Sequence, residues 1–297
     1  MSVDVTSAAT LRRYLSRGLR LGAFVSPEDT DVFARVSRRA ALRTRVGVIL
    51  DLGCGSGIPT IHACGRSHFG LGLDLSVEAV DLAGCNAAAE RRDVAFVQTD
   101  FFQCKGNFSL IMSNPPYIPA RTEEIDISLE VQGDGSAVLK NILGSYRGMT
   151  QDFVLHFASI SNPLEIFRAA YESDLKLAYL ELTIAPFGSY TSAPERLAYL
   201  LECREAKTAF FRGPTVGSDA SSKYDQLLMT AHFSEMRSSH QAERSTVLEN
   251  LEEILLSFQS HGINSAAAAL RSSAVKQIVK MRVFRGSHSF KSSSRPR

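Results

Sequence analysis

The chain of 297 residues lacks three features that would assign a protein early to a class. No stretch approaches the roughly 18 consecutive apolar residues of a membrane-spanning helix, so we expect no membrane partner. None of the five cysteines forms a C-x-x-C pair, which indicates neither a zinc site nor a redox pair, and we expect no metal. An odd number of cysteines, read as free thiols, suits a reducing compartment. Arg12 and Arg13 interrupt the apolar segment that a secretory signal would need, so a cytoplasmic location is predicted.

The chain also lacks a strong excess of charge. A formal net charge of +2 does not require a nucleic-acid partner. The basic residues are nevertheless unevenly placed, since residues 271–297 contain several arginines and lysines and no acid. We interpret this end as solvated surface that finishes in a disordered tail. Weak nucleic-acid contact through the tail is the alternative, because such clusters can bind phosphate.

Strand-like and helix-like stretches alternate between residues 46 and 233. The strand candidates are short and apolar, and they lie at residues 46–53, 69–76, 94–101, 108–116, 152–160, 175–185 and 225–233. This alternation predicts an α/β fold with a mainly parallel sheet and helices on both faces. We therefore divide the chain into a helical segment (1–45), an α/β domain (46–233) and a helical C-terminal extension (234–297). Within the extension, residues 264–284 are predicted to form a helix.

A run of alternating glycines follows the first strand candidate in "VILDLGCGSGIPT". Gly53, Gly55 and Gly57 allow a tight turn and a close approach of a ligand to the backbone. The carboxyl end of a strand in an open α/β sheet is a common ligand site, so a nucleotide-like cofactor is predicted. Asp51 precedes the glycines, which is unfavourable for a pyrophosphate and favourable for a cation. The ammonium and sulfonium groups of S-adenosylmethionine fit this arrangement.

Two further acids end the next two strand candidates. Asp74, followed by Leu75, stands 23 positions after Asp51, where a carboxylate can accept hydrogen bonds from ribose hydroxyls. Asp100 ends the third strand candidate and can accept from an adenine amino group, with Phe101 packed on the base. Three acids at successive strand ends make a cofactor site a stronger hypothesis than three unrelated surface aspartates.

Together, the segments "DLGCGSG", "GLDLS", "QTDFF" and "SNPPYIP" resemble the motifs of class I S-adenosylmethionine-dependent methyltransferases that act on planar nitrogen. The spelling of the last segment is most similar to the glutamine N5-methyltransferases that modify protein release factors. Upstream, "SPEDTD" (26–31) resembles the P-R-P-E-T-E segment of that family and also suits a helix start, with Ser26 as cap. The resemblance covers residues 24–150. It implies a Rossmann-like sheet, S-adenosylmethionine as cofactor and a protein glutamine as methyl acceptor.

The N-P-P-Y segment is chemically suited to a flat nitrogen. Its two prolines fix the backbone and remove two donors, so the loop is rigid and its carbonyls are free to accept. The Asn114 side-chain oxygen and the Pro115 carbonyl can accept the two N–H bonds of an amide or amino group, while Tyr117 can stack on its plane. The resemblance implies these roles for Asn114, Pro115 and Tyr117, and it also places Asn114 against the cofactor.

Other acceptors and one other class of protein remain open. An adenine amino group in RNA or DNA and a small-molecule amine or carboxamide offer the same planar nitrogen. The chain departs from the family where Cys54 replaces a usual threonine, where E-P is missing after "EV", and in its C-terminal 60 or so residues. A non-catalytic cofactor-binding or scaffold module is the alternative class, although it would have no use for an intact N-P-P-Y.

His156 and the "SISNP" turn (159–163) are interpreted as structural.

Overall fold

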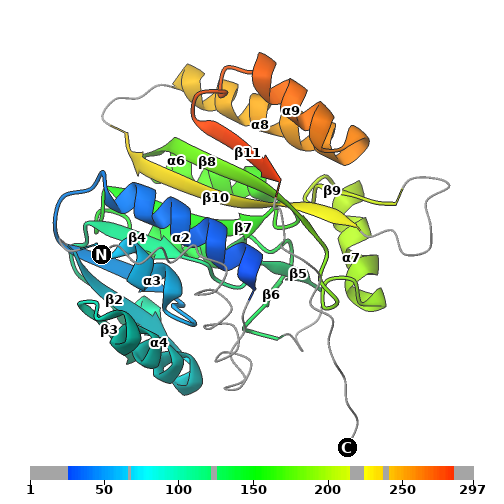
Figure 1. Ribbon diagram of the computed structural model, residues 1–297. Helices are drawn as coiled ribbons and strands as arrows, with labels where there is room; N and C mark the ends of the chain where they lie inside the picture. The colour runs from blue at the N-terminus through cyan, green and yellow to red at the C-terminus, as the bar shows by residue number, and fades with distance from the viewer. Residues whose placement is uncertain (1–25, 66–67, 122–125, 215–223, 237–240, 284–297) are drawn as a thin grey trace, which may run out of the picture.

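A computed structural model of the chain describes residues 26–65, 68–121, 126–214, 224–236 and 241–283 (Figure 1). The predicted helical segment before residue 26 and the predicted basic tail after residue 283 lie outside the described residues. Within the described part, no helix is long and apolar enough to cross a membrane.

The centre of the fold is a nine-stranded sheet with the order β11-β8-β10-β7-β4-β1-β2-β3 and the short β9 paired beside β10. All neighbouring pairs are parallel except those that involve β10, which runs against β7, β8 and β9. The predicted mainly parallel α/β fold is therefore confirmed. The strands are β1 (Val48–Leu52), β2 (Phe69–Asp74), β3 (Val94–Gln98), β4 (Leu110–Ser113), β7 (Asp152–Ala158), β8 (Leu175–Pro186), β9 (Phe211–Arg212), β10 (Asp225–Glu235) and β11 (Val279–Val283).

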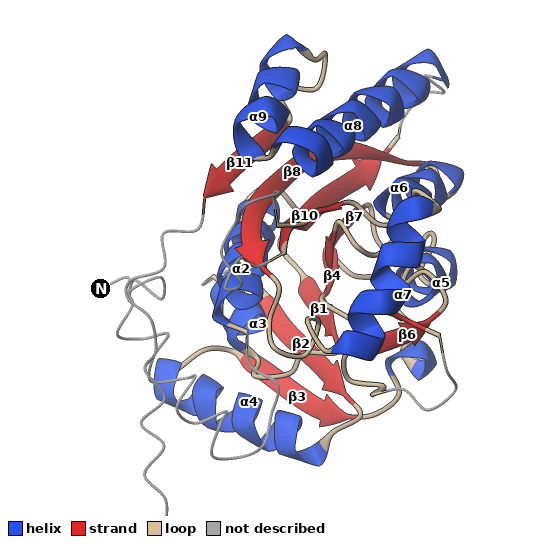
Figure 2. Ribbon diagram, turned by 90° about the vertical axis from the view of Figure 1, so that its right-hand side faces the viewer, coloured by secondary structure: helices blue, strands red, loops and turns tan. Residues whose placement is uncertain are grey.

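Helices cover both faces of the sheet (Figure 2). Successive side chains of β1 point to opposite faces of the sheet, and both faces are apolar. Ile49 packs toward α2 and α3, whereas Leu50 and Leu52 pack in the larger core under α5, α6 and α8. The helices are α2 (Pro27–Ala41), α3 (Ile58–Ala63), α4 (Val77–Glu90), α5 (Ala137–Ser145), α6 (Pro163–Glu172), α7 (Pro194–Glu205), α8 (Gln241–His261) and α9 (Ile263–Ser272), with a 3₁₀ turn η1 (Phe101–Gln103).

Helix α2 begins as its sequence predicts. Ser26 is the N-cap, its hydroxyl accepts from the Asp29 amide, and Pro27 occupies the first turn. The helix buries Phe33, Val36 and Ala40 against the sheet. This packing holds the start of α2, and with it Asp29, over the carboxyl end of the sheet.

The predicted helix over residues 264–284 is wrong at its C-terminal end. Helix α9 ends at Ser272, and residues 279–283 form β11, which extends the sheet parallel to β8. In "VKMRV" apolar and basic residues alternate, with Val279 buried and Met281 half-buried, which is the period of a strand. The free edge of β8 supplies the backbone partners that such a short strand requires.

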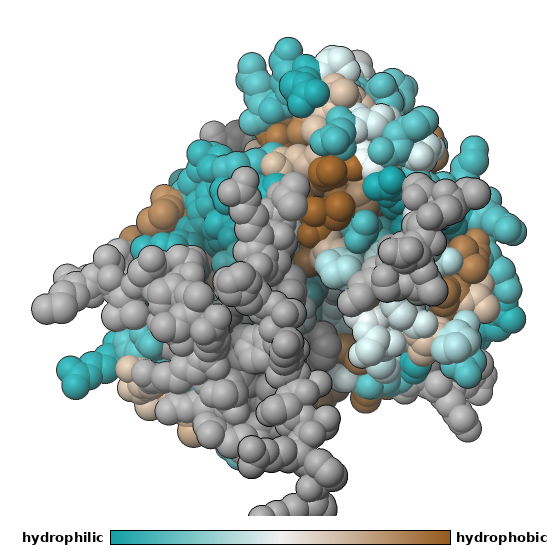
Figure 3. Space-filling model, turned by 45° about the vertical axis from the view of Figure 1, so that its right-hand side comes forward, coloured by the Kyte–Doolittle hydropathy of each residue, from teal (hydrophilic) through white to brown (hydrophobic). Residues whose placement is uncertain are grey.

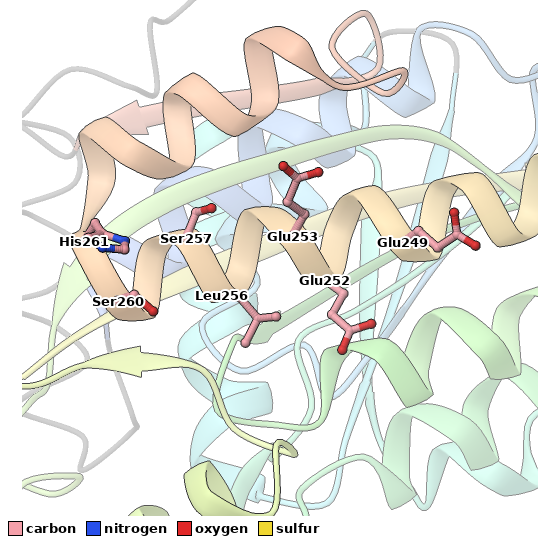
Figure 4. Close-up of a pocket in the computed structure, with 7 residues that line it drawn as sticks. All are labelled: Glu249, Glu252, Glu253, Leu256, Ser257, Ser260 and His261. Carbon is pink, nitrogen blue, oxygen red and sulfur yellow. The ribbon is translucent and has the colours of Figure 1, made fainter.

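The surface over α8 and α9 is largely hydrophilic, with an apolar patch directly below it (Figure 3). Helix α8 turns Leu251, Ile254 and Phe258 into the core. A hollow of about 450 Å³ lies along its outer side and is lined by Glu249, Glu252, Glu253, Leu256, Ser257, Ser260 and His261 (Figure 4). These residues all belong to one helix and none lies in the glycine loop or the N-P-P-Y segment.

Candidate functional site

The glycine loop follows β1, and all three of its glycines have a left-handed backbone conformation. Their φ angles are 72° at Gly53, 51° at Gly55 and 70° at Gly57. The Gly53 and Cys54 amides both donate to the Leu73 carbonyl, at 2.8 and 2.9 Å, which ties the loop to β2. A Cβ at Gly53 or Gly55 would meet no atom within 4 Å, whereas at Gly57 it would lie 2.6 Å from Phe96. The first two glycines therefore leave space for a ligand, and the third allows close packing.

Asp51 lies beneath this loop and is only 1% exposed. Its Oδ2 accepts from the Thr60 hydroxyl at 2.5 Å, while its Oδ1 is buried without a hydrogen-bond partner among the described residues. Burial raises the pKa of Asp51 to about 7, the Thr60 hydrogen bond opposes this rise, and the charge of Asp74 adds to it. A buried carboxylate with an unpartnered oxygen is a suitable neighbour for a cationic ligand.

The other two predicted acids stand at the ends of the neighbouring strands. Asp74 accepts from the Gly55 amide at 2.9 Å and from the Ser76 amide at 3.0 Å, so it bridges the loop and the start of α4. Asp100 caps η1 by accepting from the Phe102 amide at 3.0 Å. Leu75 is exposed and Phe101 is half-buried. The parallel register places all of these residues at one edge of the sheet, as their positions in the sequence predict.

The N-P-P-Y segment lies at the same edge, between β4 and the short strand β5 (Ile118–Ala120). Ser113, the last residue of β4, donates to the Leu52 carbonyl at 2.7 Å, so the segment begins beside the glycine loop. Pro115 is buried and Asn114 is half-buried. Within the described part of the chain the Asn114 side chain has no hydrogen-bond partner, which leaves its oxygen able to accept from a ligand.

The Tyr117 side chain is held by two other residues of the chain. Its hydroxyl donates to Asp29 Oδ1 at 2.6 Å, and its ring lies edge-on to His156 with the centroids 6.1 Å apart. Burial and the neighbouring Asp29 raise the pKa of the Tyr117 hydroxyl well above its usual value, so it stays a donor. Neither Asp29 nor His156 was predicted as a site residue. The only local signal was the position of Asp29 inside "SPEDTD".

The segment after N-P-P-Y also supports the loop. Strand β5 pairs in parallel with β6 (Glu130–Gln132), a small sheet that the sequence did not predict. Gly135, at φ 82°, passes so close to the Tyr117 carbonyl that a Cβ there would lie 2.3 Å from that oxygen. Asn162 of "SISNP" stands at the N-cap position of α6, where its side chain donates to Asp134 at 2.6 Å instead of capping the helix, and the segment joins β7 to α6, which confirms its interpretation as a strand-to-helix turn.

A mainly parallel sheet with one antiparallel strand and a glycine loop after the first strand is the arrangement of class I S-adenosylmethionine-dependent methyltransferases, and N-P-P-Y after the fourth strand resembles those that act on planar nitrogen. In agreement, residues 30–144 match the family model of the methyltransferase small domain. The chain therefore carries a class I methyltransferase domain, and the cofactor of this class is S-adenosylmethionine.

Curated relatives share this part of the chain. A release factor glutamine methyltransferase of Haemophilus influenzae is 35% identical over 147 residues, which are 41% of this chain and 50% of that protein. One of Bradyrhizobium diazoefficiens is 41% identical over 92 residues, 28% of this chain and 30% of that protein. The chain thus spans about half the length of the first relatives that it matches, or less. Among solved structures, magnesium protoporphyrin IX methyltransferase of Synechocystis aligns with a TM-score of 0.42 at 14% identity, over 76% of this chain and 92% of that one.

The residues present fit S-adenosylmethionine. Gly53 and Gly55 leave open space along the loop, and the unpartnered Asp51 Oδ1 lies below it. Asp74, Leu75, Asp100 and Phe101 line the adjoining strand ends, where the sequence predicts contacts to ribose and adenine. These individual roles stay predictions.

Binding of S-adenosylmethionine is expected to strengthen as the pH rises. The pKa of Asp51 is raised to about 7, and a bound cation favours the ionised carboxylate. Binding then releases up to one proton, so the affinity should rise by up to about eightfold between pH 6 and pH 7.5. Isothermal titration calorimetry in two buffers of different ionisation enthalpy would measure both the affinity and the released proton. Asp51→Asn should bind more weakly and without this pH dependence, whereas a flat wild-type profile would contradict the prediction.

Proposed function

We propose that this protein transfers a methyl group from S-adenosylmethionine to the side-chain nitrogen of a protein glutamine. The observation that carries the proposal is the segment "SNPPYIP" at the end of β4, directly beside the glycine loop of β1. The names of the curated relatives favour glutamine as the acceptor, because those proteins are release factor glutamine methyltransferases.

The chemistry follows from the acceptors of the loop. An amide nitrogen is a poor nucleophile because its lone pair is delocalised into the carbonyl. The Asn114 side-chain oxygen and the Pro115 carbonyl accept its two N–H bonds, which localises the lone pair and turns it toward the cofactor. Tyr117 fixes the plane of the amide. When bound, the cofactor supplies an electrophilic sulfonium methyl: the N–C bond forms as the S–C bond breaks, and the nitrogen releases one proton.

The proposal is tested with purified bacterial release factors and methyl-labelled S-adenosylmethionine. We expect one label per release factor, located on a single glutamine by mass spectrometry. A fractionated cell extract, treated in parallel, reports the other acceptors with a planar nitrogen. Label in RNA, DNA or small molecules, with none in the release factors, would overturn the glutamine proposal. Cofactor binding without transfer to any fraction would instead indicate a binding module.

A further inference from the structure

A chain of four polar side chains connects helix α2 to the N-P-P-Y segment. Thr230 Oγ1 lies 2.7 Å from His156 Nδ1, His156 Nε2 lies 2.9 Å from Asp29 Oδ1, and the same oxygen accepts from the Tyr117 hydroxyl at 2.6 Å. The four residues come from β10, β7, α2 and the loop after β4. His156 and Thr230 are fully buried, and the Asp29 side chain is 13% exposed.

This arrangement determines the orientation of each member. Burial of an imidazole and a carboxylate is costly unless their polar atoms are paired, and here both nitrogens of His156 have a partner. Ser113 of β4 pairs with Leu155 of β7, so His156 lies beside the residue at which the N-P-P-Y segment begins. His156, held in the central sheet, therefore lies next to the Tyr117 side chain, whose rotatable bonds would otherwise allow several orientations.

We propose that Asp29 and His156 are positioning residues that hold the Tyr117 ring in the orientation required for methyl transfer. The inference rests on the proposed function and adds helix α2 to the active site. Because Gly135 packs against the Tyr117 carbonyl, the backbone is held from one side while Asp29 holds the hydroxyl from another. The ring is then pre-oriented for the flat substrate before it binds.

The charge state of Asp29 suits this role. Burial raises the pKa of its carboxyl group, but hydrogen bonding and charge from His156, with hydrogen bonds from Ser26 and Tyr117, outweigh burial and lower it overall. Asp29 is therefore a carboxylate at neutral pH and can accept from both neighbours. No other titratable group is hydrogen-bonded to its Oδ1 among the described residues.

A double-mutant cycle in turnover tests the positioning role. We expect Asp29→Asn and Tyr117→Phe each to lower kcat about tenfold or more, with the cofactor Kd within twofold of wild type. The double variant should be no slower than the slower single variant, because both changes break one chain. Asp31→Asn is the matched control, since it makes the same change two residues further along α2, where the side chain pairs with Arg35 and not with Tyr117 or His156, and its kcat should stay within twofold. Multiplicative losses, or equal losses of cofactor affinity, would overturn the proposal.

A second measurement does not depend on the acceptor. The imidazole nitrogens of His156, observed by ¹⁵N NMR and assigned with His156→Gln, should shift in Asp29→Asn and stay unchanged in Asp31→Asn. Turnover is measured on release factor or, where that accepts no label, on the extract fraction that does. If nothing is labelled, the cycle is read from urea midpoints, where the shifts of Asp29→Asn and Tyr117→Phe should overlap rather than add. Additive shifts with an unchanged His156 spectrum would overturn the positioning pair, whichever acceptor is found.

Discussion

Replacing Asn114 with alanine is expected to lower methyl transfer about 100- to 1,000-fold, the usual effect of removing one preorganised hydrogen-bond partner from a reacting group. Asn114 follows β4 beside the glycine loop, and its side chain has no hydrogen-bond partner in the described part of the chain. Its loss should therefore leave the fold intact. Cofactor affinity should stay within a few-fold, because Asp51, Asp74 and the glycines remain.

The measurements for this prediction are turnover with labelled cofactor and cofactor Kd by calorimetry. Asn141→Ala, an exposed asparagine on α5, is the matched control and should change neither. A loss of cofactor affinity as large as the loss of turnover would contradict the role of Asn114 as acceptor for the substrate N–H. It would place that side chain on the cofactor alone.

The strands that build the site could be predicted because their signals are local. Strands β1, β2 and β4 are short apolar runs that stop at Gly53, Asp74 and Asn114, and each stop is also a predicted site residue. In a parallel sheet such stops meet at one edge, so the motifs assemble once the strand order is right. Strand β11 could not be predicted in this way. Its five residues follow an alanine-rich helix, and their strand conformation depends on β8, about 100 residues earlier in the chain.

The support of Tyr117 was missed for a related reason. Asp29 and His156 are 127 residues apart, and His156 and Thr230 are 74 apart, so no sequence pattern joins them. A single histidine inside a strand is more often structural than functional, and here it is buried in the sheet as that view predicts. Its proximity to the N-P-P-Y segment follows from the register of β7 against β4, which only the assembled sheet provides.

Replacing Glu181 with alanine is expected to give the largest loss of stability. This carboxylate in β8 is 2% exposed, and its Oε1 accepts from Arg35 of α2 at 2.6 Å. Arg282 of β11 forms an ion pair with the same oxygen at 3.0 Å, in a geometry too bent for a hydrogen bond, and the Tyr179 hydroxyl donates to Oε2 at 2.9 Å. Removing the shared acceptor leaves Arg35 with Asp31 alone and Arg282 and the Tyr179 hydroxyl without this partner. Because both arginines are partly exposed, the expected cost is about 2–3 kcal/mol.

Thermal and urea unfolding would measure this loss, with an expected fall in Tm of about 5–10 °C. Glu172→Ala, an exposed glutamate at the end of α6, is the matched control and should shift Tm little. Glu181 joins α2 to the C-terminal strand, and α2 also presents Asp29 to Tyr117. Turnover of Glu181→Ala should therefore fall even below its unfolding temperature, and more than in Glu172→Ala. An unchanged Tm would show that α2 and β11 are held by apolar packing alone, without this buried carboxylate.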